Sequence, residues 1–140
     1  LQAFPKTSGS KGLQIYVPLN TPVTYNETKP FAHALAKLLE QRHPKDVLSV
    51  MTKELRTGKV FIDWSQNDDS KTTVCVYSLR ARPHPTVSTP VTWDEVERVV
   101  ESGNPDDLVF RADAVLERVE AHGDLFAPLN ELEHSLPAPP

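Results

Sequence analysis

The sequence has almost no cysteine and no long apolar segment. Cys75 is the only cysteine among 140 residues, which excludes an intrachain disulfide and a thiolate zinc site. No apolar run approaches the ~18 residues of a membrane-spanning helix, and no signal peptide is recognisable. Cys75 lies in an apolar, strand-like run, so we expect a buried and inert thiol. Because the sequence begins with Leu1 rather than methionine, we expect a fragment, a processed product or a trimmed chain. A cytoplasmic protein of bacterial type fits all of these features.

The net charge of −4 hides two regions of opposite charge. Residues 1–90 contain 12 Lys and Arg against 7 Asp and Glu, a net charge of +5, whereas residues 91–140 contain 3 against 12, a net charge of −9. A polyanionic ligand is expected at the basic region. The acidic region is typical of two solvated helices, although an ordinary uneven surface explains the same counts.

Short strands are predicted in the basic region. Residues 13–17 form an apolar run with β-branched side chains that ends at Pro18, which is typical of a buried strand. Residues 60–64 form a second apolar run, and residues 72–79 alternate weakly. We expect these last two segments to pair antiparallel across the polar turn 65–71.

Two helices have recognisable start signals. The first is expected to begin near Pro30 with Thr28 as its N-cap, and to end before Pro44. The second begins at Thr92 and Glu95, which form a capping box because each side chain satisfies a free backbone amide of the other.

A third helix is predicted over residues 108–122 and is closed by Gly123. A length of 140 residues indicates one domain that is large enough to bury a core without cross-links. Short strands mixed with helices, without strict alternation, predict an α+β fold.

Residues 8–12 form a small turn that is rich in hydroxyl groups and glycine and is followed by a strand. Glycine lets backbone amides approach an anion, the Ser8 hydroxyl adds a donor, and Lys11 adds a positive charge. A P-loop needs a longer spacing and a following helix, so this turn is not one. The pattern is consistent both with a phosphate-binding site and with a plain surface hairpin.

Asp63 is a lone carboxylate near the end of an apolar strand. Mg²⁺ and Mn²⁺ are usually held by one or two protein carboxylates together with substrate phosphates, so Asp63 is a candidate metal ligand. A salt bridge is the alternative, since an unpaired buried carboxylate is costly. Asp68 and Asp69 lie in a polar turn and are expected to be solvated, which leaves no obvious second carboxylate for two-metal chemistry.

Arg80 and Arg82 lie two residues apart in an extended segment and therefore share a face. Two guanidinium groups on one face indicate phosphate contacts or carboxylate pairing rather than a core position. Lys53, Arg56 and Lys71 add further positive charge to the same region of the sequence.

These segments together resemble the second half of the polymerase domain of bacterial ligase D, a family of the archaeo-eukaryotic primase superfamily. Their order and spacing agree over about residues 4–125, and the combination is far more specific than any single piece. Residues 1–132 are therefore expected to be the C-terminal part of a primase-polymerase-like domain, and residues 133–140 a proline-rich tail or linker. The matching stretches are 4–13, 51–53 with Arg56, 58–67, 71–73, 77–83 and 89–93.

The resemblance implies a primase-like α+β fold with a mixed or antiparallel sheet flanked by helices. It also implies the addition of nucleotides, often ribonucleotides, at DNA ends during non-homologous end joining, with Mn²⁺ or Mg²⁺ as cofactor. The implied partners are DNA ends, nucleoside triphosphates, Ku and a ligase module, in the bacterial cytoplasm and at the nucleoid during repair. No membrane partner is expected.

The resemblance also assigns roles to individual residues. Asp63 is implied as a catalytic metal ligand, and Arg56 is implied to act near the reacting phosphate and the primer end. The implied nucleotide-binding residues are Ser8, Lys11, Gln14, Gln66 and Arg80. The implied DNA-binding residues are Lys53 and Arg82, with Asn67 in a supporting role.

Two departures from the family pattern leave the activity of this chain open. The family's first motif, a pair of aspartates upstream of the turn, has no counterpart in the seven residues before Ser8. The family has a histidine where this chain has Gln14, and glutamine cannot become cationic. We expect a catalytic half that an absent segment or a separate chain completes. The alternatives are a non-catalytic relative that binds DNA ends or nucleotides, and a fragment without a present function.

Overall fold

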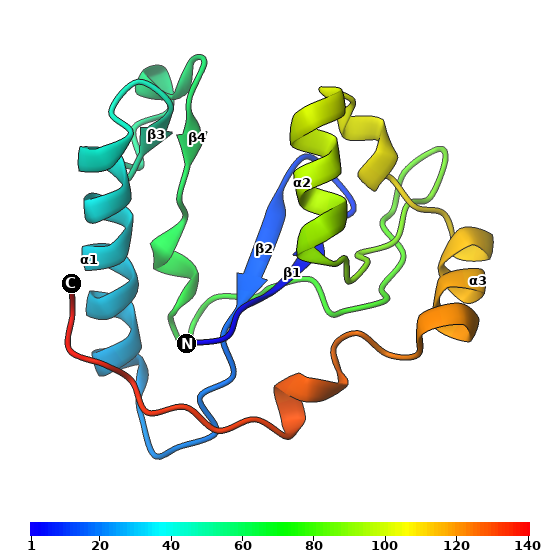
Figure 1. Ribbon diagram of the computed structural model, residues 1–140. Coiled ribbons are helices and arrows are strands. Elements are labelled where there is room, and N and C mark those ends of the chain that lie inside the picture. Colours follow the sequence, from blue (N-terminus) through cyan, green and yellow to red (C-terminus); the bar gives the residue numbers. More distant parts are fainter. The chain divides into compact units, whose positions relative to one another are not determined.

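The computed structural model describes residues 1–140, which divide into two compact units. The first unit consists of Leu1–Asn20 and Val74–His134, and the second unit consists of Thr21–Thr73 and Ser135–Pro140. Each unit contains one two-stranded sheet (Figure 1). None of the helices combines the length and the apolar composition needed to cross a membrane. The mixture of short strands and helices confirms the predicted α+β class.

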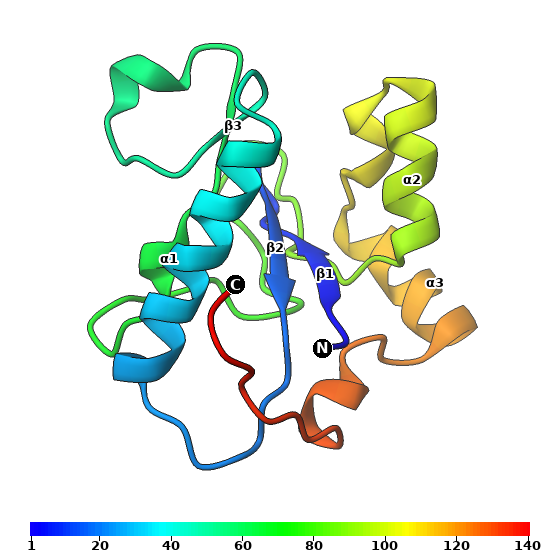
Figure 2. The same ribbon diagram turned by 60° about the vertical axis from the view of Figure 1, so that its left-hand side comes forward.

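The sheet of the first unit pairs β1 (Phe4–Thr7) with β2 (Leu13–Tyr16) in antiparallel orientation (Figure 2). β2 confirms the strand predicted after the turn. β1 has no clear strand signal, because proline and lysine are poor strand formers. It forms because residues far along the chain also bond to it: the N–H of Thr7 donates to the carbonyl of Thr89 (2.8 Å).

Residues 72–79 do not form the predicted strand, and the predicted hairpin with residues 60–64 is wrong. Tyr77 has a positive φ of 64°, which interrupts extended backbone. Its N–H donates to the carbonyl of Ser88 (2.8 Å), so the segment folds back on later residues of the first unit. Cys75 is consequently exposed rather than buried, since the segment that carries it is not part of a sheet.

Two helices complete the secondary structure predicted for the acidic region. Helix α2 (Trp93–Ser102) begins with the predicted capping box, and helix α3 (Ala112–His122) is closed by the expected glycine. α3 starts later than predicted, after a 3-10 helix (Pro105–Leu108) and an extended stretch. The carbonyl of Phe110 accepts a hydrogen bond from the N–H of Val87 (2.9 Å), which holds this stretch in extended form.

The core of the first unit is small, and its buried apolar side chains come from α3 and from connecting segments. The ring of Tyr16 packs edge-on against Phe126, with ring centroids 5.5 Å apart. A short 3-10 helix (Ala127–Asn130) follows. The buried apolar side chains of this unit are Val87, Val91, Val115 and Phe126.

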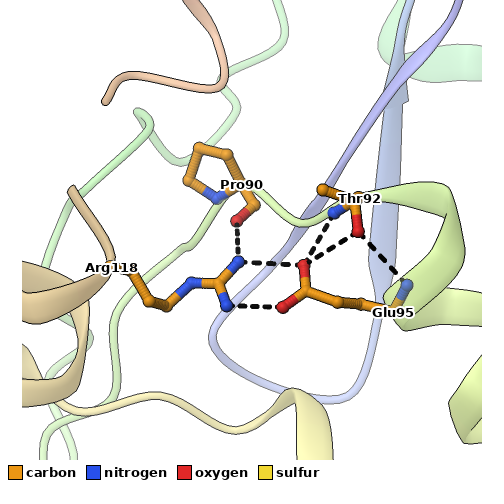
Figure 3. Close-up of polar contacts among 4 residues, drawn as sticks. All are labelled: Pro90, Thr92, Glu95 and Arg118. Atoms are coloured by element: carbon orange, nitrogen blue, oxygen red, sulfur yellow. Dashed lines mark hydrogen bonds and ion pairs between the residues drawn. The ribbon is translucent and has the colours of Figure 1, made fainter. Parts of the chain in front are cut away.

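An arginine of α3 fastens the start of α2 to the segment before it (Figure 3). Both terminal nitrogens of Arg118 donate to the carboxylate of Glu95, and one also donates to the carbonyl of Pro90 (3.1 Å). Glu95 also accepts from the N–H of Thr92 (2.8 Å). Burial alone would raise the pKa of Glu95, but the bonds from Arg118 and Thr92 outweigh it and lower this pKa. The carboxylate is therefore ionised and paired at neutral pH.

Replacing Arg118 by Gln should lower the free energy of unfolding of the first unit by about 2 kcal/mol at pH 7, because Glu95 then lacks its charged partner. The pKa of Glu95 is lowered on folding, so its stabilising contribution is present above the ordinary value of 4.5 and disappears as the pH falls below that value. The loss of unfolding free energy caused by this substitution should therefore be smaller at about pH 3.5. Denaturant titrations at both pH values measure it, with the exposed Arg98→Gln as control. Equal losses in the two variants would contradict the role of the ion pair.

The second unit begins with helix α1 (Tyr25–Arg42). Its N-cap is Thr24 and not the predicted Thr28, because Thr24 and Glu27 form a capping box one turn earlier. The carboxylate of Glu27 accepts from the N–H of Thr24 (2.9 Å). Pro30 consequently lies inside the helix rather than in its first turn, and it removes one backbone donor there. The helix ends just before a proline, as predicted.

The sheet of the second unit pairs β3 (Val47–Leu48) with β4 (Val60–Phe61) in parallel orientation. A 3-10 helix (Lys53–Arg56) lies between these strands, and another (Trp64–Gln66) follows β4 closely. The strand predicted here is shortened to its first two residues, because Asp63 already serves as the N-cap of the second 3-10 helix. The short strand therefore presents a carboxylate directly after it ends.

Candidate functional site

The turn after β1 is closed by the side chain and backbone of Ser8. Its hydroxyl oxygen accepts from the N–H groups of Ser10 and Gly12, both at 3.1 Å. The N–H of Ser8 donates to the carbonyl of Gly12 (2.8 Å). The amides of Ser8, Ser10 and Gly12 are therefore used inside the turn, and the hydroxyl hydrogen of Ser8 and the ammonium of the exposed Lys11 are among the donors that it presents to a ligand.

Two arginines brace this turn from the segment that follows Tyr77. Gly9 has a φ of 69°, and a Cβ built there would lie 2.6 Å from Cγ of Arg80. Only glycine allows this close approach. The hydroxyl of Thr86 donates to the carbonyl of Gly9, and Arg82 donates to the hydroxyl of Ser10. The first unit thus brings the turn, Arg80 and Arg82 together.

Gln14 lies on β2, opposite Lys6 of β1. Its side-chain oxygen is buried and has no hydrogen-bond partner in the protein. Such an acceptor is costly unless a donor reaches it. Gln14 is therefore suited to accept from a hydroxyl or amino group of a ligand, a role that a neutral amide performs without any positive charge.

The burial of Lys6 was not predicted from the sequence. Its side chain is 1% exposed, and its ammonium donates to the carbonyl of Val74 (2.9 Å) and to the hydroxyl of Ser88 (2.5 Å). Burial lowers the pKa of Lys6 to about 8; the Cys75 side chain acts in the opposite sense, and the charge of Arg80 lowers this pKa further. A lysine within a short strand gives little local signal, so only the fold reveals it.

Asp63 in the second unit is exposed and is bonded to its own neighbours. Its two carboxylate oxygens accept from the hydroxyl of Ser65 (2.6 Å) and the amide of Gln66 (2.9 Å). Burial alone would raise the pKa of Asp63, but these hydrogen bonds and the charge of Lys71 together lower this pKa. The carboxylate is therefore ionised at neutral pH and oriented by the 3-10 helix. Gln66 contacts Asp63 directly, so these two predicted site residues do meet.

The donor set tests whether this chain alone fits a divalent metal ion. No group of three or more His, Cys, Asp or Glu side chains gathers anywhere in residues 1–140. Asp68 is engaged by Lys29 and Ser70, whose hydrogen bonds lower its pKa. Asp63 therefore fits as one hard oxygen ligand of Mg²⁺ or Mn²⁺, with phosphate oxygens, water or carboxylates from elsewhere as the others.

Arg56 is fastened to its own loop. Its guanidinium lies 4.0 Å from the centre of the Phe61 ring and donates to the carbonyl of Met51 (2.5 Å). Its Nε is buried and has no partner. Lys53 is exposed on the same 3-10 helix, and Asn67 donates from its amide to the carbonyl of Trp64 (3.1 Å). These residues do not bond to Asp63.

The predicted site residues thus form two groups, one in each unit. The first unit carries the residues suited to bind phosphate, and the second unit carries Asp63, the candidate metal ligand, together with polar and basic residues of the same region. The group in the first unit is Ser8, Lys11, Gln14, Arg80 and Arg82. The group in the second unit is Lys53, Arg56, Asp63, Gln66 and Asn67.

Fold and side chains define the class of the protein as an α+β chain that carries a glycine turn braced by arginines and an oriented, ionised carboxylate. Sequence comparison identifies the family. The family described as "LigD, primase-polymerase domain" matches residues 1–126. The chain belongs to this family, which confirms the resemblance.

Similar proteins with curated names include LigD proteins of several bacteria. The "Multifunctional non-homologous end joining protein LigD" of Mycolicibacterium smegmatis is 50% identical over 130 residues, which are 93% of this chain and 16% of that protein. The "Bifunctional non-homologous end joining protein LigD" of Bacillus subtilis is 31% identical over 124 residues, 88% of this chain and 20% of that protein. The chain therefore spans only a small part of these relatives.

A solved structure supports the same assignment. The polymerase domain from Mycobacterium tuberculosis ligase D, in complex with DNA, matches with a TM-score of 0.83 and 46% identity. The match covers 94% of this chain and 44% of that chain. The predicted primase-polymerase-like fold is confirmed by this similarity.

Proposed function

We propose that the chain is part of a nucleotidyltransferase that adds nucleotides to DNA ends during non-homologous end joining. The observation that carries the proposal is the interlocked turn of the first unit, where the Ser8 turn, Arg80 and Arg82 converge. Membership of the LigD primase-polymerase family and the names of the relatives support it. The reaction class fits a cluster of hydroxyl, ammonium and guanidinium donors, which suits a triphosphate.

The site residues of this chain would each have a distinct role in the reaction. Lys11 and Arg80 would bind the triphosphate as cations, and the hydroxyl of Ser8 would donate to a phosphate oxygen. Asp63 would be one ligand of Mn²⁺ or Mg²⁺, held in orientation by Ser65 and Gln66. When bound, such an ion neutralises the charge that develops on the phosphates. Arg56 would act near the reacting phosphate and the primer end.

DNA ends are the proposed macromolecular partner, with Lys53 and Arg82 as contacts to the phosphate backbone. The M. tuberculosis polymerase domain in complex with DNA supports this assignment. Ku, a ligase module and a bacterial cytoplasmic location with recruitment to the nucleoid are further parts of the proposal, which the LigD names of the relatives support.

A segment or a separate chain that carries a pair of aspartates is also proposed as a partner. No group of three or more His, Cys, Asp or Glu side chains accompanies Asp63 in residues 1–140, which supports this partner, since two-metal chemistry needs more than one carboxylate. Three side chains of the β2 region, Leu13, Ile15 and Val17, are exposed at alternate positions, although they are large and apolar. An apolar stripe of this kind favours coverage by further polypeptide.

A second candidate function is non-catalytic binding of nucleotides or DNA ends. The neutral acceptor of Gln14 and the absence of a cluster of potential metal ligands around Asp63 favour it over catalysis by this chain alone. The two candidates differ in one respect that is measurable: only the first predicts nucleotide addition once the aspartate pair is supplied.

Calorimetric titration of the chain with a nucleoside triphosphate and Mn²⁺ tests the phosphate assignment. Lys11→Ala and Arg80→Ala should each raise the Kd roughly tenfold, because each removes one charge-assisted contact. Lys45→Ala, which removes an exposed lysine of the second unit, should leave the Kd unchanged. Equal affinity in all three variants would remove Lys11 and Arg80 from the site. Absence of binding both alone and with the aspartate-bearing segment would overturn the proposed function.

A further inference from the structure

A recess on the second unit is lined by none of the residues to which a role is assigned above. Its volume is about 290 Å³, just below the ~300–1,000 Å³ of small-molecule pockets. Five of the residues that line it belong to the first half of α1, and the sixth belongs to the 3-10 helix that follows Asp63. The lining residues are Tyr25, Asn26, Lys29, Pro30, His33 and Trp64.

Flat aromatic rings dominate the recess. The imidazole of His33 is stacked on the indole of Trp64, with ring centroids 3.8 Å apart and an angle of 18° between the planes. The indole N–H of Trp64 donates to the carbonyl of Ser49 (2.9 Å), which fixes the orientation of the ring. The side chain of Tyr25 is large and its residue is 52% exposed. A rigid stack beside an exposed phenol is suited to a planar ligand.

The polar groups of the recess select among planar ligands. Asn26 is exposed, and its amide offers two donors and an acceptor, which match the edge of a nucleobase. The ammonium of Lys29 is already paired with the carboxylate of Asp68. A free triphosphate would therefore find no unpaired lysine or arginine among the lining residues. A base that belongs to a nucleic-acid strand keeps its phosphates outside the recess, so it does not need an unpaired lysine or arginine there.

The recess also lies beside the candidate metal ligand in the sequence. Trp64 directly follows Asp63, and both belong to the start of the same 3-10 helix. A strand that is held at Asp63 would therefore have a neighbouring base close to the indole.

We propose that this recess binds one unpaired nucleobase of single-stranded DNA, stacked against the aromatic group of Tyr25, His33 and Trp64. This inference depends on the geometry of the recess and not on the phosphate assignment. It rests on the proposed function in one respect, because it specifies how an overhang at a DNA end is bound. The ligand class is a strand with an unpaired base, and its recognition is by stacking and is therefore tolerant of sequence.

The test uses the full chain and a short oligothymidylate that carries one 2-aminopurine, whose fluorescence is quenched by stacking. The double variant Tyr25→Ala/His33→Ala should bind this probe roughly fivefold to a hundredfold more weakly, the range for loss of one base–aromatic stack. It should also lose the quenching. His33→Phe, which keeps a flat ring, should retain both affinity and quenching, and Gln41→Ala at an exposed position of α1 should behave like the wild type.

Three results would overturn the proposal. The first is no binding of the probe by the wild-type chain, and the second is equal binding by the double variant. The third is displacement of the probe by free deoxyadenosine monophosphate with the same sensitivity to the double variant, which would make the recess a site for free nucleotides. Lys11→Ala separates the two proposals, because it should weaken triphosphate binding and leave binding and quenching of the probe unchanged.

Discussion

Replacing Asp63 by Asn should reduce nucleotide addition by roughly a hundredfold to a thousandfold, the scale on which loss of one group that stabilises transition-state charge slows a reaction. The variant keeps an oxygen that can accept from Ser65 or Gln66, so part of the hydrogen bonding around this position is retained. Stability should therefore change by less than about 1 kcal/mol. The loss of rate would reflect the missing negative charge on a metal ligand rather than unfolding.

The measurement requires the chain together with the segment that supplies the aspartate pair. Nucleotide addition to a DNA end, Mn²⁺ binding by electron paramagnetic resonance and thermal unfolding should be recorded on one preparation. Asp69→Asn removes an exposed carboxylate from the same unit and should leave all three unchanged. Full activity and unchanged Mn²⁺ affinity in Asp63→Asn would show that Asp63 is only the cap of its helix.

Signals that are complete within a few residues predicted the elements that they control. Thr92 and Glu95 satisfy each other's backbone amides within one turn, and α2 begins there. The same chemistry operates at Thr24 and Glu27, but the prediction followed apolar spacing and the proline, and it placed the N-cap at Thr28. Helix starts were therefore predictable from side-chain chemistry where that chemistry was given priority.

Pairing between distant segments was not predictable in the same way. β3 and β4 are two residues long, so they carry no periodicity that identifies a partner. The positive φ of Tyr77 also lacks the glycine that usually marks such a position. These two features explain why neither the parallel pair nor the exposure of Cys75 was predicted.

The site residues were predicted from the family resemblance, but their bonds were not. The fold shows that Gln66 supports Asp63, that Arg82 donates to the turn and that Arg56 is held by its own loop. The burial of Lys6 was not predicted, because it depends on segments that are more than 65 residues away in the sequence. Burial of this kind is a property of the fold and leaves no pattern near the residue.

The burial of Lys6 leads to the second large expected effect, a rise in the stability of the first unit between about pH 8 and pH 10. The pKa of Lys6 is lowered from 10.5 to about 8 on folding. Between these values the unfolded chain binds more protons than the folded chain, so the free energy of unfolding increases with pH. The full window corresponds to roughly 3 kcal/mol at about 1.4 kcal/mol per pH unit.

Two tyrosines of the same unit lower the stability of the folded chain at higher pH. Burial raises the pKa of Tyr16, and burial together with the hydrogen bond to Asp124 raises the pKa of Tyr77. The folded chain then keeps these protons above the ordinary tyrosine value of 10.0, so stability falls as the pH rises further. The rise caused by Lys6 is therefore expected to reach its maximum near pH 10.

Lys6→Met separates the charge from the packing of this side chain, because methionine has a similar length and no charge. The variant should show no rise in unfolding free energy between about pH 8 and pH 10, whatever its stability at pH 7. Lys11→Met, which replaces an exposed lysine in the turn that follows β1, should keep the rise. Urea titrations followed by the fluorescence of Trp93, in a Trp64→Phe background, report on the first unit. A rise of equal size in Lys6→Met would mean that another group causes it. Loss of the rise would show that the chain maintains a destabilising buried cation at neutral pH, next to the segment that carries Arg80.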